Sequence, residues 1–189
     1  MIADKDRSGW FGASDTDKII GRWTSKTWKK WWMQKLGFNH DHFENKYTLA
    51  GTHYEHRILE SLGILMEFDK QILFEDLRLR VNLDGNTAVC IYECKTWKAD
   101  RPFKMPQKYI NQVQVQMFAT GIHRAEIVVY LMEEADYKNF FRPIDPKRVL
   151  RVPVVYDELW IKGKYLPKLN RLAECLRSGM LPEEARICL

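Results

Sequence analysis

The residues best suited to chemistry lie in one short segment, Glu93-Cys94-Lys95. Side chains alternate along a β-strand, so in a strand predicted over 88–97 Glu93 and Lys95 would share a face while Cys94 points the other way. A carboxylate next to an amine could belong to a catalytic site or form an ordinary surface ion pair. Taken alone, this spacing favours the ion pair.

A second acid, Asp84, strengthens the case for a metal site because it comes just before this strand. The Gly-Asn at 85–86 favours a tight hairpin turn, which would leave Asp84 about 20 Å from Glu93. A turn at 87–88 would instead place Asp84 opposite Ile91 and diagonal to Glu93, within ~8 Å. We expect the later turn, which would let one divalent ion take an oxygen from each acid.

A third acid, Glu55, is expected on a helix. Ile58, Leu59 and Leu62 follow it at i+3, i+4 and i+7, so Glu55 lies in line with the apolar stripe that faces the core. A carboxylate in that position is costly unless it is paired or bound to a metal. The alternative to a metal is an ion pair with a buried arginine or lysine, and Lys95 is one such partner.

Three acids and a lysine suit Mg²⁺, because hard cations take oxygen ligands and Mg²⁺ retains waters beside one or two carboxylates. Phosphodiester hydrolysis needs a nucleophilic hydroxide and a stabilised leaving oxygen, and a bound metal supplies both. Lys95 would orient or help deprotonate the attacking water, or steady the charged phosphate. Gln112, Gln114 and Gln116 on the next helix either hold the lysine, the water or DNA, or mark a partly exposed helix.

Composition and charge fit a single domain over 1–189 that binds a polyanion. The chain is 46% hydrophobic, enough for a sizeable core. No segment approaches the ~20 apolar residues of a membrane span, and the polar segment 1–6 is no signal peptide, so we expect a cytoplasmic protein. The net charge is +5; segment 18–35 carries six basic residues and no acid, and 95–108 carries five basic residues and one acid, which favours DNA binding.

The periodicity predicts an α/β fold, a mixed sheet flanked by helices. The expected helices are a short one capped by Ser14 and ending at Gly21, one ending at Leu36, and three over 52–62, 108–120 and 157–178. The expected strands cover 72–83, 88–97, 125–132 and 149–155, and a loop is expected over 38–50. The tryptophans at 23, 28, 31 and 32 are expected in the core or at a subunit contact, with stacking of one on a base as the alternative.

Four segments follow one another in the order seen in the PD-(D/E)xK nucleases. They are Gly51-Thr-His-Tyr-Glu55, Leu83-Asp84-Gly85, Glu93-Cys94-Lys95 and Tyr109-Ile-Asn-Gln112-Val-Gln114. More closely, nearly the whole chain resembles the group of phage lambda exonuclease and the YqaJ-type viral recombinases, and Arg7-Ser-Gly-Trp-Phe-Gly-Ala-Ser14-Asp15 resembles the opening motif of that group. Leu83 stands where the superfamily name has proline, which is often absent there.

The resemblance implies a restriction-endonuclease-like core and assigns roles residue by residue. The metal ligands would be Glu55, Asp84 and Glu93, the catalytic lysine Lys95, the active-site glutamine Gln112, and the holders of the 5′-terminal phosphate Arg7 and Ser14. Ser14 also has a physical reason, since free N–H groups at a helix start favour an anion.

The activity implied is that of a Mg²⁺-dependent 5′→3′ exonuclease on double-stranded DNA, with Mn²⁺ as a substitute. It would leave a 3′ single strand for an annealing protein in phage recombination, inside a bacterial host, and it would act as a ring-shaped homotrimer.

Two other functions remain open. One is a restriction-like or structure-specific endonuclease of the same fold; the cysteines at 90, 94, 175 and 188 do not match the iron–sulfur type, which has one early and three late cysteines. The other is a DNA-binding module with a decayed site, against which the presence of all four core residues argues.

Overall fold

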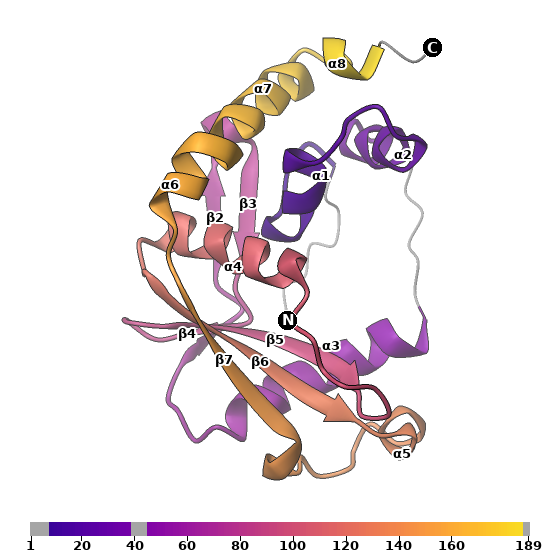
Figure 1. Cartoon of the computed structure of the whole chain (residues 1–189), viewed down its shortest axis with the longest axis vertical. Helices are drawn as coiled ribbons and strands as arrows, with labels where there is room; N and C mark the ends of the chain where they lie inside the picture. The colour runs from indigo at the N-terminus through magenta and orange to yellow at the C-terminus, as the bar shows by residue number, and fades with distance from the viewer. Residues whose placement is uncertain (1–7, 39–44, 187–189) are drawn as a thin grey trace.

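A five-stranded mixed sheet runs through the molecule and carries helices on both faces (Figure 1). The computed structural model describes residues 8–38 and 45–186, and its sheet has the order β1-β4-β5-β6-β7. The strands are β1 (Glu67–Phe68), β4 (Gly85–Asn86), β5 (Ile91–Lys98), β6 (Arg124–Met132) and β7 (Val149–Val155), with β2 (Gln71–Phe74) and β3 (Leu79–Asn82) in a separate pair. β5 and β6 are parallel and the other neighbours antiparallel. The predicted α/β fold is confirmed.

Alternation along β5 divides the interior into two cores. Ile91 packs in the core formed with α4 (Gln107–Thr120). Its neighbour Tyr92 packs in the core formed with α3 (Lys46–Glu60), on the opposite face. Because side chains alternate with a period of two, Glu93 returns to the α4 face.

Helices from both ends of the chain pack together on the α4 side of the sheet (Figure 1). The remaining helical elements are η1 (Ala13–Asp15), α1 (Thr16–Ile20), α2 (Lys26–Lys35), η2 (Glu75–Leu77), α5 (Glu134–Lys138), η3 (Pro146–Arg148), α6 (Glu158–Trp160), the π-helical segment Ile161–Tyr165, α7 (Leu166–Arg177) and α8 (Glu183–Arg186). In the described part, every helix is too short or too polar to cross a bilayer.

The helix predicted over 157–178 is interrupted, and this part of the prediction is wrong. It begins as expected at Asp157, whose side chain accepts from the Trp160 N–H (2.9 Å). A π-helical turn then precedes α7, and Pro167, which has no N–H to donate backward, lies in the first turn of α7. Neither the π turn nor α8 was predicted.

The tryptophans at 23, 28, 31 and 32 form one buried cluster, each less than 9% exposed. The rings of Trp28 and Trp32 stack with centroids 5.3 Å apart. Ser25 caps α2, accepting from the Trp28 N–H (3.2 Å). The predicted core role is confirmed, and stacking on a base is wrong because these rings are enclosed.

The strand predicted over 72–83 is a hairpin of β2 and β3 joined by η2. Arg78 makes the turn possible by adopting a left-handed conformation (φ 49°). Its guanidinium donates to the Gly9 carbonyl (2.9 Å) and lies 4.7 Å from the centre of the Trp10 ring. The apolar alternation continues through this turn, and the segment contains no glycine or proline that would indicate a turn.

The loop predicted over 38–50 is shorter than expected, because α3 already begins at Lys46. The Asn45 side-chain oxygen accepts from the Tyr47 N–H (2.9 Å), which satisfies one donor at the helix start. Ala50 is fully buried one turn before Tyr54, so the apolar face of α3 extends back to this turn.

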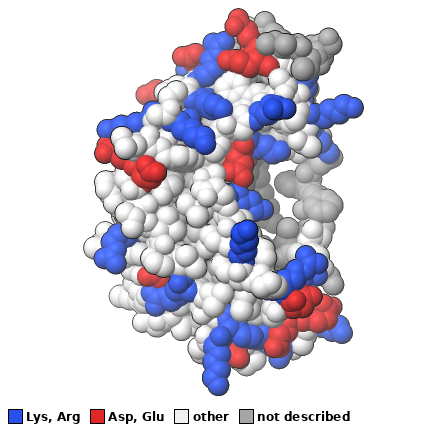
Figure 2. Space-filling model, viewed as in Figure 1, with Lys and Arg blue, Asp and Glu red and all other residues white. Residues whose placement is uncertain are grey.

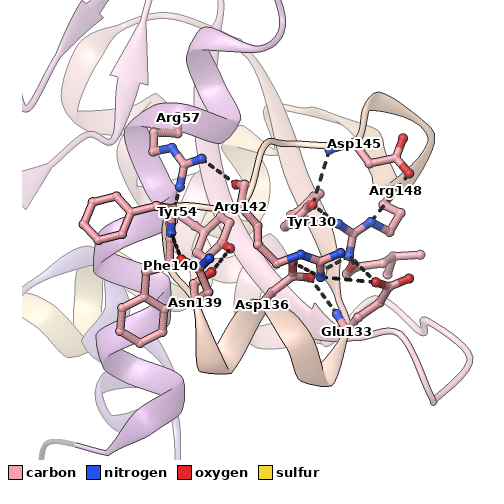
Figure 3. Close-up of polar contacts among 12 residues, drawn as sticks. Tyr54, Arg57, Tyr130, Glu133, Asp136, Asn139, Phe140, Arg142, Asp145 and Arg148 are labelled. Carbon is pink, nitrogen blue, oxygen red and sulfur yellow. Dashed lines mark hydrogen bonds and ion pairs between the residues drawn. The ribbon is translucent and has the colours of Figure 1, made fainter.

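A buried aspartate fixes the segment after β6 against α3 (Figure 3). Asp136 is fully enclosed and accepts from Arg142 (2.8 Å) and Arg148 (2.6 Å). Arg57 of α3 in turn donates to the Arg142 carbonyl (2.6 Å). The arginine bonds hold the pKa of Asp136 below its usual value although burial alone would raise it. The network therefore holds the helix that carries Glu55.

Asp136→Ala should lower the free energy of unfolding by about 3 kcal/mol, at the lower end for a buried ion pair because both arginines reach solvent. Glu133→Gln is the matched control: Glu133 lies near the same two arginines but is 52% exposed, so a loss under about 1 kcal/mol is expected. Urea unfolding at neutral pH measures both, and equal losses would contradict the assignment.

Candidate active site

A cavity of about 220 Å³ brings together the residues that the sequence singled out for chemistry. Its lining includes Glu55 from α3, Asp84 from the bend between β3 and β4, Glu93 and Lys95 from β5, and Gln112 from α4. Five side chains that are far apart in the sequence thus share one site.

Glu93 is 1% exposed, yet both of its carboxylate oxygens have hydrogen-bond donors. Oε1 accepts from the Lys95 ammonium and from the Gln112 amide, the latter at 2.6 Å. Oε2 accepts from the Gln116 amide (2.5 Å). The predicted shared face of Glu93 and Lys95 is confirmed, and the glutamines of α4 contact this pair.

Asp84 reaches the site because the hairpin turns late, as predicted. The last backbone bond before the turn runs from the Thr87 N–H to the Cys90 carbonyl (2.9 Å), and the Thr87 hydroxyl accepts from the Cys90 N–H (3.1 Å). The turn therefore lies at 88–89, one residue beyond the expected place. Continued by one pair, this register places Asp84 opposite Glu93 and not opposite Ile91, which corrects the predicted pairing.

The glycine after Asp84 serves packing and not the turn. A Cβ on Gly85 would lie 2.6 Å from the Met66 sulfur and 3.1 Å from a Leu59 methyl. Gly85 therefore lets β4 approach α3 closely. The Asp84 side chain in turn accepts from the Cys94 N–H (2.8 Å), which ties the bend to β5.

Burial and neighbouring acids raise the pKa values of Asp84 and Glu55. Burial, followed by the charges of Glu93 and Glu55, raises the pKa of Asp84 well above its usual range. Burial and the charge of Glu93 also raise the pKa of Glu55. Burial lowers the pKa of Lys95, but the charges of Glu93 and Asp84 outweigh it and the net shift is upward. Lys95 is thus held as a cation among carboxylates that outnumber it.

Glu55 has other neighbours besides the cavity acids. The predicted alternative was an ion pair with Lys95, but Lys95 forms its ion pair with Glu93. Glu55 also belongs to a group with His56 and Asp69 whose potential ligand atoms all lie within 4.8 Å of one another. His56 Nε2 lies 3.1 Å from an Asp69 oxygen. Glu55 therefore lines the cavity together with Asp84 and Glu93 and also belongs to a group of potential metal ligands with His56 and Asp69.

Ser14 lines the cavity, but it is not the helix cap that we expected. It lies inside η1, where the preceding Gly12 is the N-cap. The capping acceptor is Asp15, which accepts from the Gly12 N–H (2.8 Å) and pairs with Lys35 (2.6 Å). The negative charge of Asp15 thus occupies the anion-favouring place. Arg7, the other predicted phosphate holder, lies outside the described residues.

Two polar residues of β3 also line the cavity, and the sequence analysis missed them. Arg80 is 8% exposed, and Asn82 is half-buried. The segment before η1 runs parallel to β3 here, because Phe11 forms a parallel bridge with Leu79 and its carbonyl accepts from the Arg80 N–H (2.8 Å). The available signal was the alternation of Arg78, Arg80 and Asn82, whose polar face leads directly to Asp84.

Asp84→Asn should stabilise the protein once divalent cations are removed, and more so at pH 8 than at pH 5. The raised folded-state pKa means that the contribution of Asp84 to stability is greatest below its ordinary pKa and is lost as pH rises through the folded-state value. An asparagine side chain does not ionise, so the variant does not lose stability in this way as the pH rises. Thermal unfolding in chelator measures the difference; a gain that does not grow with pH, or an equal gain for exposed Asp76→Asn, would contradict it.

Comparisons with known proteins agree with this architecture. The model of the YqaJ-like viral recombinase domain matches residues 4–123. The alkaline exonuclease LHK-Exo from Laribacter hongkongensis is 18% identical, with a TM-score of 0.63 and coverage of 92% of this chain and 94% of that one. A structure of LHK-Exo in complex with dAMP is 16% identical, with a TM-score of 0.67 and coverage of 92% and 90%.

A phage-related exonuclease from Haemophilus somnus 129PT is also 18% identical, with a TM-score of 0.63 and coverage of 91% of this chain and 96% of that one. At these identities the likeness shows a shared fold. No curated protein matches the chain. The family model covers well over half of the sequence, including Glu55, Asp84, Glu93, Lys95 and Gln112. The chain therefore belongs to the family of YqaJ-like viral recombinase domains.

Proposed function

We propose that this protein is a metal-dependent 5′→3′ exonuclease that degrades linear double-stranded DNA. Family membership and the exonuclease fold support a nuclease. The proposal of a metal-dependent exonuclease rests on one observation: one cavity is lined by Glu55, Asp84, Glu93 and Lys95. This set provides oxygen ligands for a cation and a positive group for a phosphate.

The donor set fits a hard divalent cation. Glu55, Asp84 and Glu93 offer carboxylate oxygens, the ligands that Mg²⁺ and Mn²⁺ prefer. Burial and the charges of neighbouring acids raise the pKa values of Asp84 and Glu55, and the single positive charge of Lys95 does not offset this effect. When bound, the metal would supply an activated water and stabilise the leaving oxygen. We propose these three acids as its ligands.

Lys95 is proposed to hold the scissile phosphate or to orient the attacking water. Its raised pKa keeps the ammonium protonated near neutral pH, which favours these roles over that of a general base. Its Nζ also lies 5.3 Å from the centre of the Tyr109 ring, at the first turn of α4. Gln112 would keep the Glu93 carboxylate beside it.

The DNA is proposed to approach along the connection between β5 and α4. Figure 2 shows lysines and arginines spread over the visible face and interspersed with acids, so the net charge alone marks no single surface. The connection between β5 and α4 is more informative about where DNA binds. Arg101, Lys104 and Lys108 are exposed, and the Lys108 ammonium lies over the Tyr109 ring that Lys95 also contacts (5.3 Å). This places phosphate-binding charge next to the cavity.

The polarity and assembly form part of the same proposal. Ser14 is exposed in the cavity lining and could donate to a 5′-terminal phosphate, together with Arg7. The product would be a 3′ single strand for an annealing protein, made in the cytoplasm of a bacterial host during phage recombination. The resemblance to lambda-type enzymes favours a homotrimer.

Linear duplex and a closed circle, each incubated with Mg²⁺, test the central proposal. We expect digestion of the linear DNA and none of the circle. Glu93→Gln and Lys95→Ala should each lower the rate by at least about 100-fold, because a bound metal contributes several kcal/mol to catalysis. Circular dichroism controls for folding. Cutting of the circle would indicate an endonuclease, and unchanged rates in both variants would refute the site.

Removing charge from the connection and from the first turn of α4 should weaken DNA binding without changing the chemical step. For Lys104→Ala/Lys108→Ala we expect a higher KM, an unchanged kcat, and a salt dependence of binding shallower by about 0.9 per lost phosphate contact. Lys162→Ala/Lys164→Ala, in the π-helical segment, removes the same charge away from the cavity lining. Equal effects of the two pairs in binding titrations would contradict a local DNA path.

A further inference from the structure

Two glutamines of α4 hold Glu93, one from each side of its carboxylate. Gln112 donates to Oε1 (2.6 Å), and Gln116, one helical turn further on, donates to Oε2 (2.5 Å). Residues four apart on a helix lie on the same face, so both amides reach β5 from the same helix. The resemblance assigns a role to Gln112 and none to Gln116.

The two oxygens of Glu93 face different surroundings. Both partners of Oε1, Lys95 and Gln112, line the cavity. The partner of Oε2, Gln116, is fully buried and is not part of the lining. Oε1 therefore faces the space where a cation would bind, and Oε2 faces the interior.

Gln116 uses one end of its amide. Its Nε2 donates to Glu93 Oε2 and to the Asn82 carbonyl (3.2 Å). Its Oε1 is buried and has no hydrogen-bond partner among the described residues. A flipped amide would set Oε1 against two acceptors, so the orientation is determined by the donor end. Burying an unsatisfied acceptor is unfavourable for stability, which makes a purely structural role a poor explanation.

We infer that Gln116 is a positioning residue that anchors the inner oxygen of Glu93 and so presents the outer oxygen to a divalent cation. The terminal torsion of a glutamate side chain is soft, and two donors on opposite oxygens fix it. A cation would compete with Lys95 and Gln112 for Oε1, but it leaves the bond to Gln116 in place. This inference rests on the proposed metal-dependent function.

Gln114 on the same helix provides a matched control. It is 5% exposed, and both ends of its amide are used. Nε2 donates to the Val155 carbonyl (2.8 Å), and Oε1 accepts from the Asp157 N–H (2.8 Å). Gln114 therefore joins α4 to the end of β7 and the start of α6, and these two bonds do not involve Glu93.

The test is Mn²⁺ titration of the full chain without DNA, followed by electron paramagnetic resonance. Gln116→Met should weaken Mn²⁺ binding by about 10-fold or more, the usual effect of losing a residue that orients a metal ligand. Its digestion rate should recover toward that of the unchanged protein at saturating Mn²⁺. Gln114→Met should lower the melting temperature and leave the Mn²⁺ affinity unchanged.

Two further variants make the result decisive. Glu93→Gln removes the charge of the ligand itself and should weaken Mn²⁺ binding. If it does so while Gln116→Met binds Mn²⁺ normally, or if Gln114→Met loses as much affinity, the inference about Gln116 is overturned and the metal site stands. If Glu93→Gln changes nothing, the proposed metal site fails as well. Gln116→Asn, which withdraws the amide by one methylene, tests the same contact should the methionine variant not fold.

Discussion

The constraint on which the site depends is the burial of a carboxylate between a sheet and a helix. Glu93 is 1% exposed, and an isolated ion in such a place would be strongly disfavoured. Lys95 and the two glutamines of α4 supply three donors to its oxygens. Gln112 and Gln116 are explained by this demand, since α4 must cover the core and also provide donors to one buried charge.

The surrounding structure places two further acids, Asp84 and Glu55, near the buried Glu93, where burial and the charge of Glu93 disfavour a second ionised carboxylate. Asp84 is tied to β5 through the Cys94 N–H, and Glu55 is held on a helix that the Asp136 network fixes from its other side. Both acids have raised pKa values. Burial and neighbouring carboxylates are the physical causes, and perturbed pKa values of this kind cluster at functional sites.

Much of the secondary structure could be read from the sequence, and the errors share a cause. The strand at β7 and the helix at α4 have clear periodicity and end signals, and the structure shows them at the expected places. The hairpin of β2 and β3 was read as one strand because its alternation passes through a turn at Arg78. The sequence predicts Ser14 as the helix cap, but Asp15 accepts the capping hydrogen bond. Asp15 is held by an ion pair with Lys35, and a partner so distant in sequence could not be predicted from local spacing.

The sequence by itself determined the order of the motifs and the shared face of Glu93 and Lys95, because strand alternation is a local property of the backbone. It also indicated that Asp84 belongs with them if the hairpin turned late. The tertiary structure alone decided that Arg80 lines the cavity, that Gln116 contacts Glu93, and which oxygen of Glu93 faces inward. These outcomes depend on contacts between separate elements, and side-chain spacing along the chain carries no information about them.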